Sequence, residues 1–168
     1  MPVIEGLNTI DGALGTLRSA GTPVAGTSAI ESVALTGTPT GGTFTLSYGG
    51  VSTTPLAFNC AASDVLSALV ALPTIGAGNV TTAGGPQPGA AITVTFAGTL
   101  AVKNVALLGA SGALLTGGTA PAVVITYATA GVDATFRGAS RGQMLQDTTN
   151  AAFYENTGVP GAPIWTAH

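Results

Sequence analysis

Residues 63–73 of the 168-residue chain read Ser-Asp-Val-Leu-Ser-Ala-Leu-Val-Ala-Leu-Pro. Ser63 is a residue type that caps helix N-termini, and Asp64 would place a negative charge at the positive end of the helix dipole. Pro73 ends the pattern, because proline lacks an amide hydrogen and restricts the residue before it. We therefore expect one helix at about residues 63–72. Its apolar stripe consists of Val65, Leu66, Leu69, Val70 and Leu72.

The segments on both sides of this helix alternate apolar and polar residues. Residues 43–48 read Thr-Phe-Thr-Leu-Ser-Tyr, and residues 91–96 read Ala-Ile-Thr-Val-Thr-Phe. A period of two is typical of half-buried strands. The sequence thus predicts an α+β fold, a mostly antiparallel β-sheet domain with one packed helix, and Leu66 and Leu69 should be almost fully buried against the sheet. Further strands are expected at 30–36, 51–58, 79–83 and 122–128, with a short apolar segment under a loop at 105–108.

The chain divides into three parts. Residues 1–28 form an N-terminal arm and linker, in which apolar residues recur at helical spacing while glycines weaken the helix. Residues 29–131 form the α+β sheet domain. Residues 132–168 carry turn signals at 147–150 and 156–161, which predict a small C-terminal β-meander that is too small to be stable alone. The apolar residues of the arm are Ile4, Leu7, Ile10, Leu14 and Leu17.

The composition is unusually poor in charge. The chain has 4 basic and 7 acidic residues, so that 7% of its residues are charged, against about a quarter in an average domain. The net charge of −3 argues against nucleic-acid binding, which needs a basic patch. No run of about 18 apolar residues is present, so the sequence predicts no membrane span. A surface with so few charges suits a protein held in a larger assembly.

One motif resembles a catalytic signature. Residues 138–142 read Gly-Ala-Ser-Arg-Gly, which fits the G-x-S-x-G pattern, and Ser140, Asp147 and His168 follow the chain order of an α/β-hydrolase triad. The nucleophile elbow of those enzymes needs a strand before it and a helix after it, whereas a hairpin is expected here. We therefore predict no enzymatic activity.

The other residue types and motifs of the sequence indicate no site for a metal or a cofactor. A single histidine and a single cysteine, Cys60, cannot build a zinc site of ordinary spacing. The only lysine, Lys103, is not part of a P-loop pattern. The sequence predicts neither a metal site nor a bound cofactor.

Two pairs of residues in the C-terminal part are candidates for contacts with a partner. Arg137 and Arg141 could bind acidic residues of a partner, although pairing with the nearby Asp133 or Asp147 is the default. Tyr154 and Trp165 could pack across strands of the meander or anchor an interface. The apolar arm is the rival anchor, because a weakly helical segment tends to become ordered on binding.

Several stretches resemble known phage proteins. Residues 42–50, 61–69 and 72–80 resemble a module common in structural proteins of tailed bacteriophages. Residues 141–150, with Phe153-Tyr154, Asn156-Thr157-Gly158 and Pro163-Ile164-Trp165, are similar to a segment of phage head-fibre and capsid-decoration proteins.

The resemblance implies a structural virion protein that decorates the outer surface of a bacteriophage capsid and binds the major capsid protein. Such a protein would be made in the cytoplasm of the bacterial host. The apolar residues at both ends of the chain predict a homo-oligomer, and the resemblance suggests a trimer. The alternative is an adhesion module of a phage tail or fibre that binds host glycans.

Overall fold

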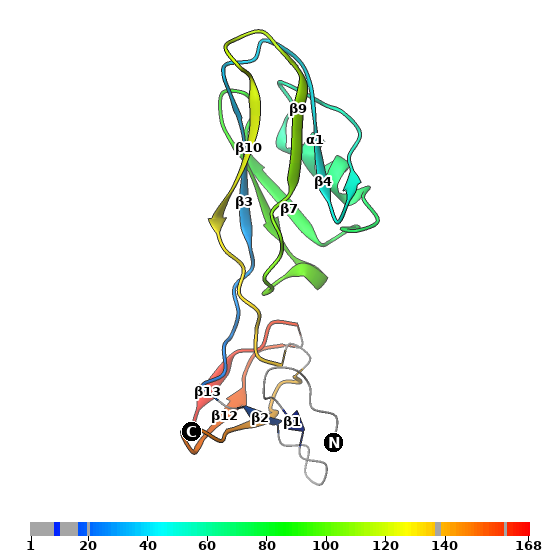
Figure 1. Ribbon diagram of the computed structural model, residues 1–168. Helices are drawn as coiled ribbons and strands as arrows, with labels where there is room; N and C mark the ends of the chain where they lie inside the picture. Colours follow the sequence, from blue (N-terminus) through cyan, green and yellow to red (C-terminus); the bar gives the residue numbers. More distant parts are fainter. Residues whose placement is uncertain (1–8, 11–16, 20, 137–138, 160) are drawn as a thin grey trace. The chain divides into compact units, whose positions relative to one another are not determined.

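The computed structural model describes residues 9–10, 17–19, 21–136, 139–159 and 161–168 (Figure 1). The chain forms two compact units. The large unit comprises residues 28–131, and the small unit comprises residues 1–27 together with 132–168. The small unit therefore contains both the arm and the C-terminal part, which the sequence predicted as separate pieces.

Two antiparallel sheets build the large unit. The first sheet has the strand order β10-β3-β8-β7. In the second sheet, β4 pairs with β5 and β6 and also with β9. Helix α1 packs beside β7 of the first sheet and β6 of the second (Figure 1). The bounds are β3 Ile30–Thr36, β4 Gly41–Tyr48, β5 Val51–Ser52, β6 Leu56–Ala57, α1 Ala62–Val70, β7 Val80–Gly84, β8 Ile92–Phe96, the 3-10 helix η1 Gly98–Leu100, β9 Gly109–Thr116 and β10 Ala122–Thr129.

The mostly antiparallel architecture with one α-helix is confirmed, but details of the helix differ from the prediction. The N-cap residue is Ala61 rather than Ser63, because the Asp64 carboxylate accepts a hydrogen bond from the Ala61 amide at 2.8 Å and closes the first turn. Leu69 is fully buried, as expected. Leu66 is only half-buried, so the prediction for it was wrong, and Ala68 takes its place on the buried face.

The two sheets and the helix enclose one continuous apolar core. Its fully buried side chains come from both sheets and from α1, which explains why a helix with only two and a half turns is stable in this chain. The largest of them are Val33, Phe44, Leu46, Val65, Leu69, Ile92, Val94 and Phe96.

One strand prediction in the large unit was wrong, and one strand was missed. Residues 51–58 do not form one strand, because they split into β5 and β6 on either side of Pro55. Strand β9 was not predicted from the sequence, although it pairs with β4 along most of its length. The expected apolar segment 105–108 lies just before β9, where Val105 and Leu108 are buried.

A buried glutamine completes the hydrogen bonding of β3. The Gln87 side chain is 3% exposed, and its amide nitrogen donates to the Val33 carbonyl at 2.7 Å. Its amide oxygen accepts a hydrogen bond from the Leu35 amide at 3.3 Å. Pairing of β3 with β8 ends at Val33. From there on, the Gln87 side chain makes the hydrogen bonds to the β3 backbone that a neighbouring strand would make.

Replacement of Gln87 with methionine keeps the length of the side chain but removes both hydrogen bonds. We expect a loss of about 2–3 kcal/mol in the free energy of unfolding, because the Val33 carbonyl would stay buried without a partner. Urea unfolding followed by circular dichroism measures this loss. The matched control is Thr93→Val, which removes one exposed hydrogen bond to Ala83 and should cost less than about 0.5 kcal/mol. Equal losses in the two variants would contradict the role assigned to Gln87.

The small unit contains a five-stranded sheet with the order β1-β2-β11-β12-β13. The three C-terminal strands pair antiparallel in sequence order, which confirms the predicted meander. Strand β2 adds to the meander in parallel to β11. The bounds are β1 Thr9–Ile10, β2 Leu17–Ser19, β11 Met144–Asp147, β12 Ala152–Asn156 and β13 Trp165–Ala167.

The helical spacing of the N-terminal arm was misleading. Ile10 and Leu17 lie in strands β1 and β2, which pair antiparallel with each other, so a helix through these two positions is wrong. Strand pairing with β11 supplies the backbone hydrogen bonds that a glycine-rich helix would have had to make alone. The other predicted arm residues, Ile4, Leu7 and Leu14, lie outside the described residues.

Candidate interaction surfaces

A compact cluster organises the small unit. Leu145 is fully buried and Ala139 is 3% exposed, and the partly buried side chains of Phe136, Tyr154 and Trp165 pack against them. The indole nitrogen of Trp165 also donates to the Thr135 carbonyl at 3.1 Å. The two aromatic residues that the sequence offered as interface anchors therefore contribute to the core of their own unit.

Asn156 connects three turns around this cluster. Its side chain is fully buried, and its amide nitrogen donates to the carbonyls of Ala139 at 2.8 Å and Ser140 at 3.2 Å. Its side-chain oxygen accepts hydrogen bonds from the amides of Gly158 and Ile164, both at 2.9 Å. One side chain thus binds four backbone groups, of which the Ser140 carbonyl also accepts a hydrogen bond from the Gln143 amide at 3.1 Å.

Replacement of Asn156 with alanine should destabilise the small unit by about 2–4 kcal/mol, because several backbone groups would lose their buried partner. Trp165 is the only tryptophan of the chain, so its fluorescence during urea unfolding reports on this unit alone. The matched control is Thr157→Val, which removes an exposed hydroxyl that contacts Thr166 and Ile164 and should cost less than about 1 kcal/mol. An Asn156→Ala midpoint equal to that of the control would show that Asn156 does not stabilise the unit.

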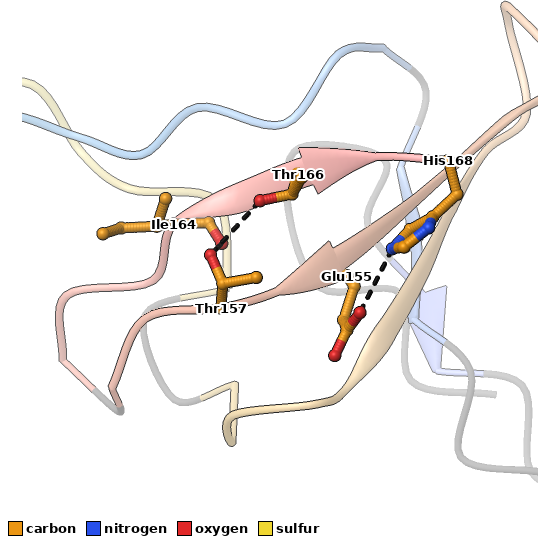
Figure 2. Close-up of polar contacts among 5 residues, drawn as sticks. All are labelled: Glu155, Thr157, Ile164, Thr166 and His168. Carbon is orange, nitrogen blue, oxygen red and sulfur yellow. Dashed lines mark hydrogen bonds and ion pairs between the residues drawn. The ribbon is translucent and has the colours of Figure 1, made fainter.

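Polar contacts also connect the last two strands of the meander. The Glu155 carboxylate lies 3.1 Å from the His168 ring nitrogen, and the hydroxyls of Thr157 and Thr166 lie 3.2 Å apart. Figure 2 marks both contacts with dashed lines. The Glu155 and His168 side chains are about half exposed, so this contact contributes little to stability even when the histidine is protonated.

Asp147 holds the hairpin turn between β11 and β12. Its carboxylate accepts hydrogen bonds from the Asn150 side chain at 2.7 Å and from the backbone amide of Thr149 at 2.9 Å. The Asn150 side chain is the main cause of a lowered pKa of Asp147, burial opposes it, and the amides of Thr149 and Asn150 lower the pKa further. A lowered pKa means that this contribution to stability is lost as the pH falls through the folded-state value.

The three residues that follow the order of a hydrolase triad have other partners. The Asp147 carboxylate is bonded to Thr149 and Asn150, and the His168 ring is paired with Glu155. Ser140 lies in an exposed turn where its amide donates to the Gln143 side chain at 3.1 Å. This arrangement differs from a nucleophile–base–acid chain. The absence of enzymatic activity stays a prediction.

The exposed apolar side chains of the small unit were not singled out from the sequence. By register, Met144 and Phe153 lie on the face of the sheet opposite to Leu145 and Tyr154, and they are 37% and 45% exposed. Side chains alternate between the two faces of β11 and β12, so a residue next to a buried one in the sequence points away from the core. This alternation could have indicated the exposed face. Together with these two, the exposed large apolar residues described in this unit are Val24, Val132, Val159 and Ile164.

The structure describes only one of the two arginines that were predicted to contact a partner. Arg141 is exposed in the turn before β11, where it is available to a partner. Arg137 lies outside the described residues. The proposed interface roles of both arginines, of Tyr154 and Trp165 and of the arm stay predictions.

The surface of the large unit is almost free of charge. Its 104 residues include only three charged ones, Glu31, Asp64 and Lys103, and Glu31 is fully buried. The segment 104–131, which contains β9 and β10, has no charged residue. This segment also exposes Leu107, Leu114, Val124 and Tyr127.

One face of the first sheet carries a row of hydroxyl groups. Thr126, Ser32 and Thr93 are in direct register across β10, β3 and β8, on the face opposite to the buried Val33 and Ile92. Thr95 and Thr81 follow in the next row of β8 and β7. This face presents hydroxyl groups and carries no charged side chain.

No group of three or more His, Cys, Asp or Glu side chains that could hold a metal ion occurs among the described residues. Within the same ranges, no helix has the length and apolar character needed to cross a membrane. The buried Cys60 is a free thiol whose pKa is raised to about 11, first by burial and then by the charge of Asp64. A thiol of this kind is unreactive at neutral pH.

Comparisons with known proteins complete the description. No protein-family model matches the chain, and no curated protein sequence matches it. Among solved structures, the chain is similar to a protein chain of Mycobacterium phage Patience, with a TM-score of 0.40 and 16% sequence identity. The match covers 84% of this chain and 55% of that one, so this chain spans little more than half the length of the phage protein.

Proposed function

We propose that the protein is a structural component of a bacteriophage virion, without enzymatic activity, that decorates the outer surface of the capsid as a decoration or head-fibre subunit. The observation that carries this proposal is the charge-poor surface of the large unit, where Asp64, which is exposed, and Lys103, which is partly buried, are the only charged residues besides the fully buried Glu31. Free soluble domains usually have about a quarter to a third of their surface residues charged, which keeps them apart in solution. A protein held at fixed positions in an assembly does not depend on this repulsion.

The resemblance of residues 42–80 and 141–165 to phage structural proteins supports the same proposal. The partner would then be the major capsid protein, and the subunits would assemble as trimers at three-fold positions of the shell. The exposed Met144 and Phe153 are the best candidates for the contact, because they lie together on one face of a sheet whose other face holds the core of the small unit. Apolar anchors of this kind dominate the energetics of many interfaces.

The number of copies per virion tests the proposal. A decoration protein should be present in a number set by the lattice points of the capsid, which cryo-electron microscopy and quantitative mass spectrometry of purified virions measure. A few copies per particle would instead place the protein in the tail, and absence from the virion would reject a structural role. Light scattering on the purified chain tests the trimer.

A pair of variants tests the contact surface. Phe153→Ser should reduce the occupancy of undecorated capsids at least tenfold, because it removes an exposed apolar side chain from the proposed contact. Gln146→Ser is the matched control, since Gln146 is in direct register with Phe153 on the same face. Trp165 fluorescence verifies that both variants keep the fold of the small unit. Wild-type occupancy of Phe153→Ser would reject this surface as the anchor.

The second candidate function is an adhesion module of a phage tail or fibre that binds host glycans. The row of Thr126, Ser32 and Thr93 favours it, because uncharged hydroxyls on a flat sheet can exchange hydrogen bonds with sugars. Glycan binding that is lost in Thr93→Val, combined with a few copies per virion, would support this candidate over capsid decoration.

A further inference from the structure

A carboxyl group is buried near the start of β3 in the large unit, and no charged partner for it is found among the described residues. Glu31 is fully buried on β3, with Val94 of β8 on one side and Tyr127 of β10 on the other. One carboxyl oxygen, Oε2, accepts a hydrogen bond from the Leu108 amide at 3.0 Å. Within the part of the chain that the structure describes, the other oxygen, Oε1, has no hydrogen-bond partner. A buried carboxylate with an unsatisfied oxygen is unfavourable, so this environment favours the protonated acid.

The titratable groups that face Glu31 add no positive charge. They are Tyr48 of β4 and Tyr127 of β10, while β8 contributes Val94 and the segment 104–108 contains no ionisable side chain. Burial raises the pKa of Tyr48 most, and the charges of Glu31 and Tyr127 raise it further. Burial likewise raises the pKa of Glu31 to about 7, against a smaller opposing effect of the Leu108 amide. The carboxyl therefore titrates near neutral pH.

The groups around Glu31 differ in how firmly they are held. Val94 and Tyr127 lie on strands paired with β3, and Tyr48 lies on β4, which pairs with β9. Leu108 belongs to the segment 104–108, which is neither helix nor strand. The contacts of this segment include the hydrogen bond from the Leu108 amide to Glu31 and one from the Tyr127 hydroxyl to the Val105 carbonyl. Asn104 also has a partner, and Val105 and Leu108 are buried. Among the groups around Glu31, the segment 104–108 is the one that can move without breaking the hydrogen bonds of a sheet.

We propose that Glu31 is a pH-responsive latch on the segment 104–108. When the carboxyl is protonated, the segment stays closed over it. When the carboxyl ionises, water reaches the charge most easily by opening of this segment, which leads directly into β9 and carries the exposed Leu107. The change would alter the charge-free surface formed by the segment and β9.

Hydrogen exchange of single backbone amides tests the latch. In the full-length chain, the protection factor of the Leu108 amide, after correction for the intrinsic pH dependence of exchange, should fall at least tenfold between pH 5 and pH 8. Amides of β3, such as that of Val33, exchange only when the unit unfolds and follow its global stability, so at pH 8 the Leu108 amide should be clearly less protected than the Val33 amide. In Glu31→Gln, the Leu108 protection factor should change less than threefold over the same range.

Two further variants keep the test decisive. Glu31→Met also lacks a titrating group and replaces Glu31→Gln if that variant does not fold. Tyr127→Phe removes the hydrogen bond from Tyr127 to the Val105 carbonyl without changing the latch, so the protection of Leu108 should be lower at every pH while its pH dependence is kept. The proposal is overturned if the wild-type protection of Leu108 is independent of pH, if Leu108 and Val33 are equally protected at pH 8, or if the non-titrating variants show the same pH dependence.

Discussion

Replacement of Leu69 with alanine is expected to lower the free energy of unfolding of the large unit by about 2–5 kcal/mol. The Leu69 side chain is fully buried in the core between α1 and the sheets. Its truncation removes apolar contacts and leaves a cavity that the paired strands cannot fill by collapsing. Urea unfolding followed by circular dichroism measures the loss.

Leu66 provides a matched control on the same helix. The change Leu66→Ala removes the same atoms and has the same effect on helix propensity, but Leu66 is only half-buried at the edge of the core. It should therefore cost about 1–2 kcal/mol. Similar losses in the two variants, or a loss below about 1 kcal/mol for Leu69→Ala, would show that α1 is not anchored through Leu69.

The parts of the fold that could be predicted from the sequence are those with a strong local signal. The helix at Ala62–Val70 has an apolar stripe and a terminating Pro73, and strands such as Ile92–Phe96 alternate cleanly. The four-residue turn after β11 is specified by Asp147, whose carboxylate binds the next backbone amides. In each case, neighbouring residues decide the local structure.

The parts that could not be predicted depend on distant partners. Strand β9 reads Gly-Ala-Ser-Gly-Ala-Leu-Leu-Thr, which has a low strand propensity, and it becomes a strand because β4 is available for pairing. The apolar spacing of Ile10 and Leu17 fits a helix, yet Leu17–Ser19 form a strand because they pair with β11. Tertiary contacts override a weak local preference in both places.

The polar residues inside the protein illustrate the same limit. Gln87 lies in a stretch of glycine and proline that reads as a turn, and only the fold brings it to Val33, 54 residues away. Asn156 looks like an ordinary turn residue, but it binds Ala139, which is 17 residues away. Glu31 lies at an inward-facing position of a strand, and this position was the available signal that its carboxyl would be buried.

The second large effect that we expect is a decrease in the stability of the large unit as the pH rises, because the buried carboxyl of Glu31 ionises. The folded-state pKa of Glu31 is about 7, whereas the ordinary value is 4.5. A raised pKa means that the unfolded chain ionises first, so the contribution of Glu31 to stability is complete below about pH 4.5 and is lost as the pH rises through 7. The difference between the two pKa values corresponds to a loss of up to about 3 kcal/mol.

Comparison of the wild type with Glu31→Gln isolates this effect, because all other titrating groups are shared. Between pH 4.5 and pH 8, the free energy of unfolding of the variant should rise relative to that of the wild type by up to about 3 kcal/mol. Urea unfolding at several pH values, followed by circular dichroism, gives this difference. The unfolding of the small unit, followed by the fluorescence of Trp165, should be the same in both proteins, because Glu31 belongs to the large unit. Parallel pH profiles of the two proteins would show that Glu31 remains ionised in the folded state, and the latch would then have no proton to release.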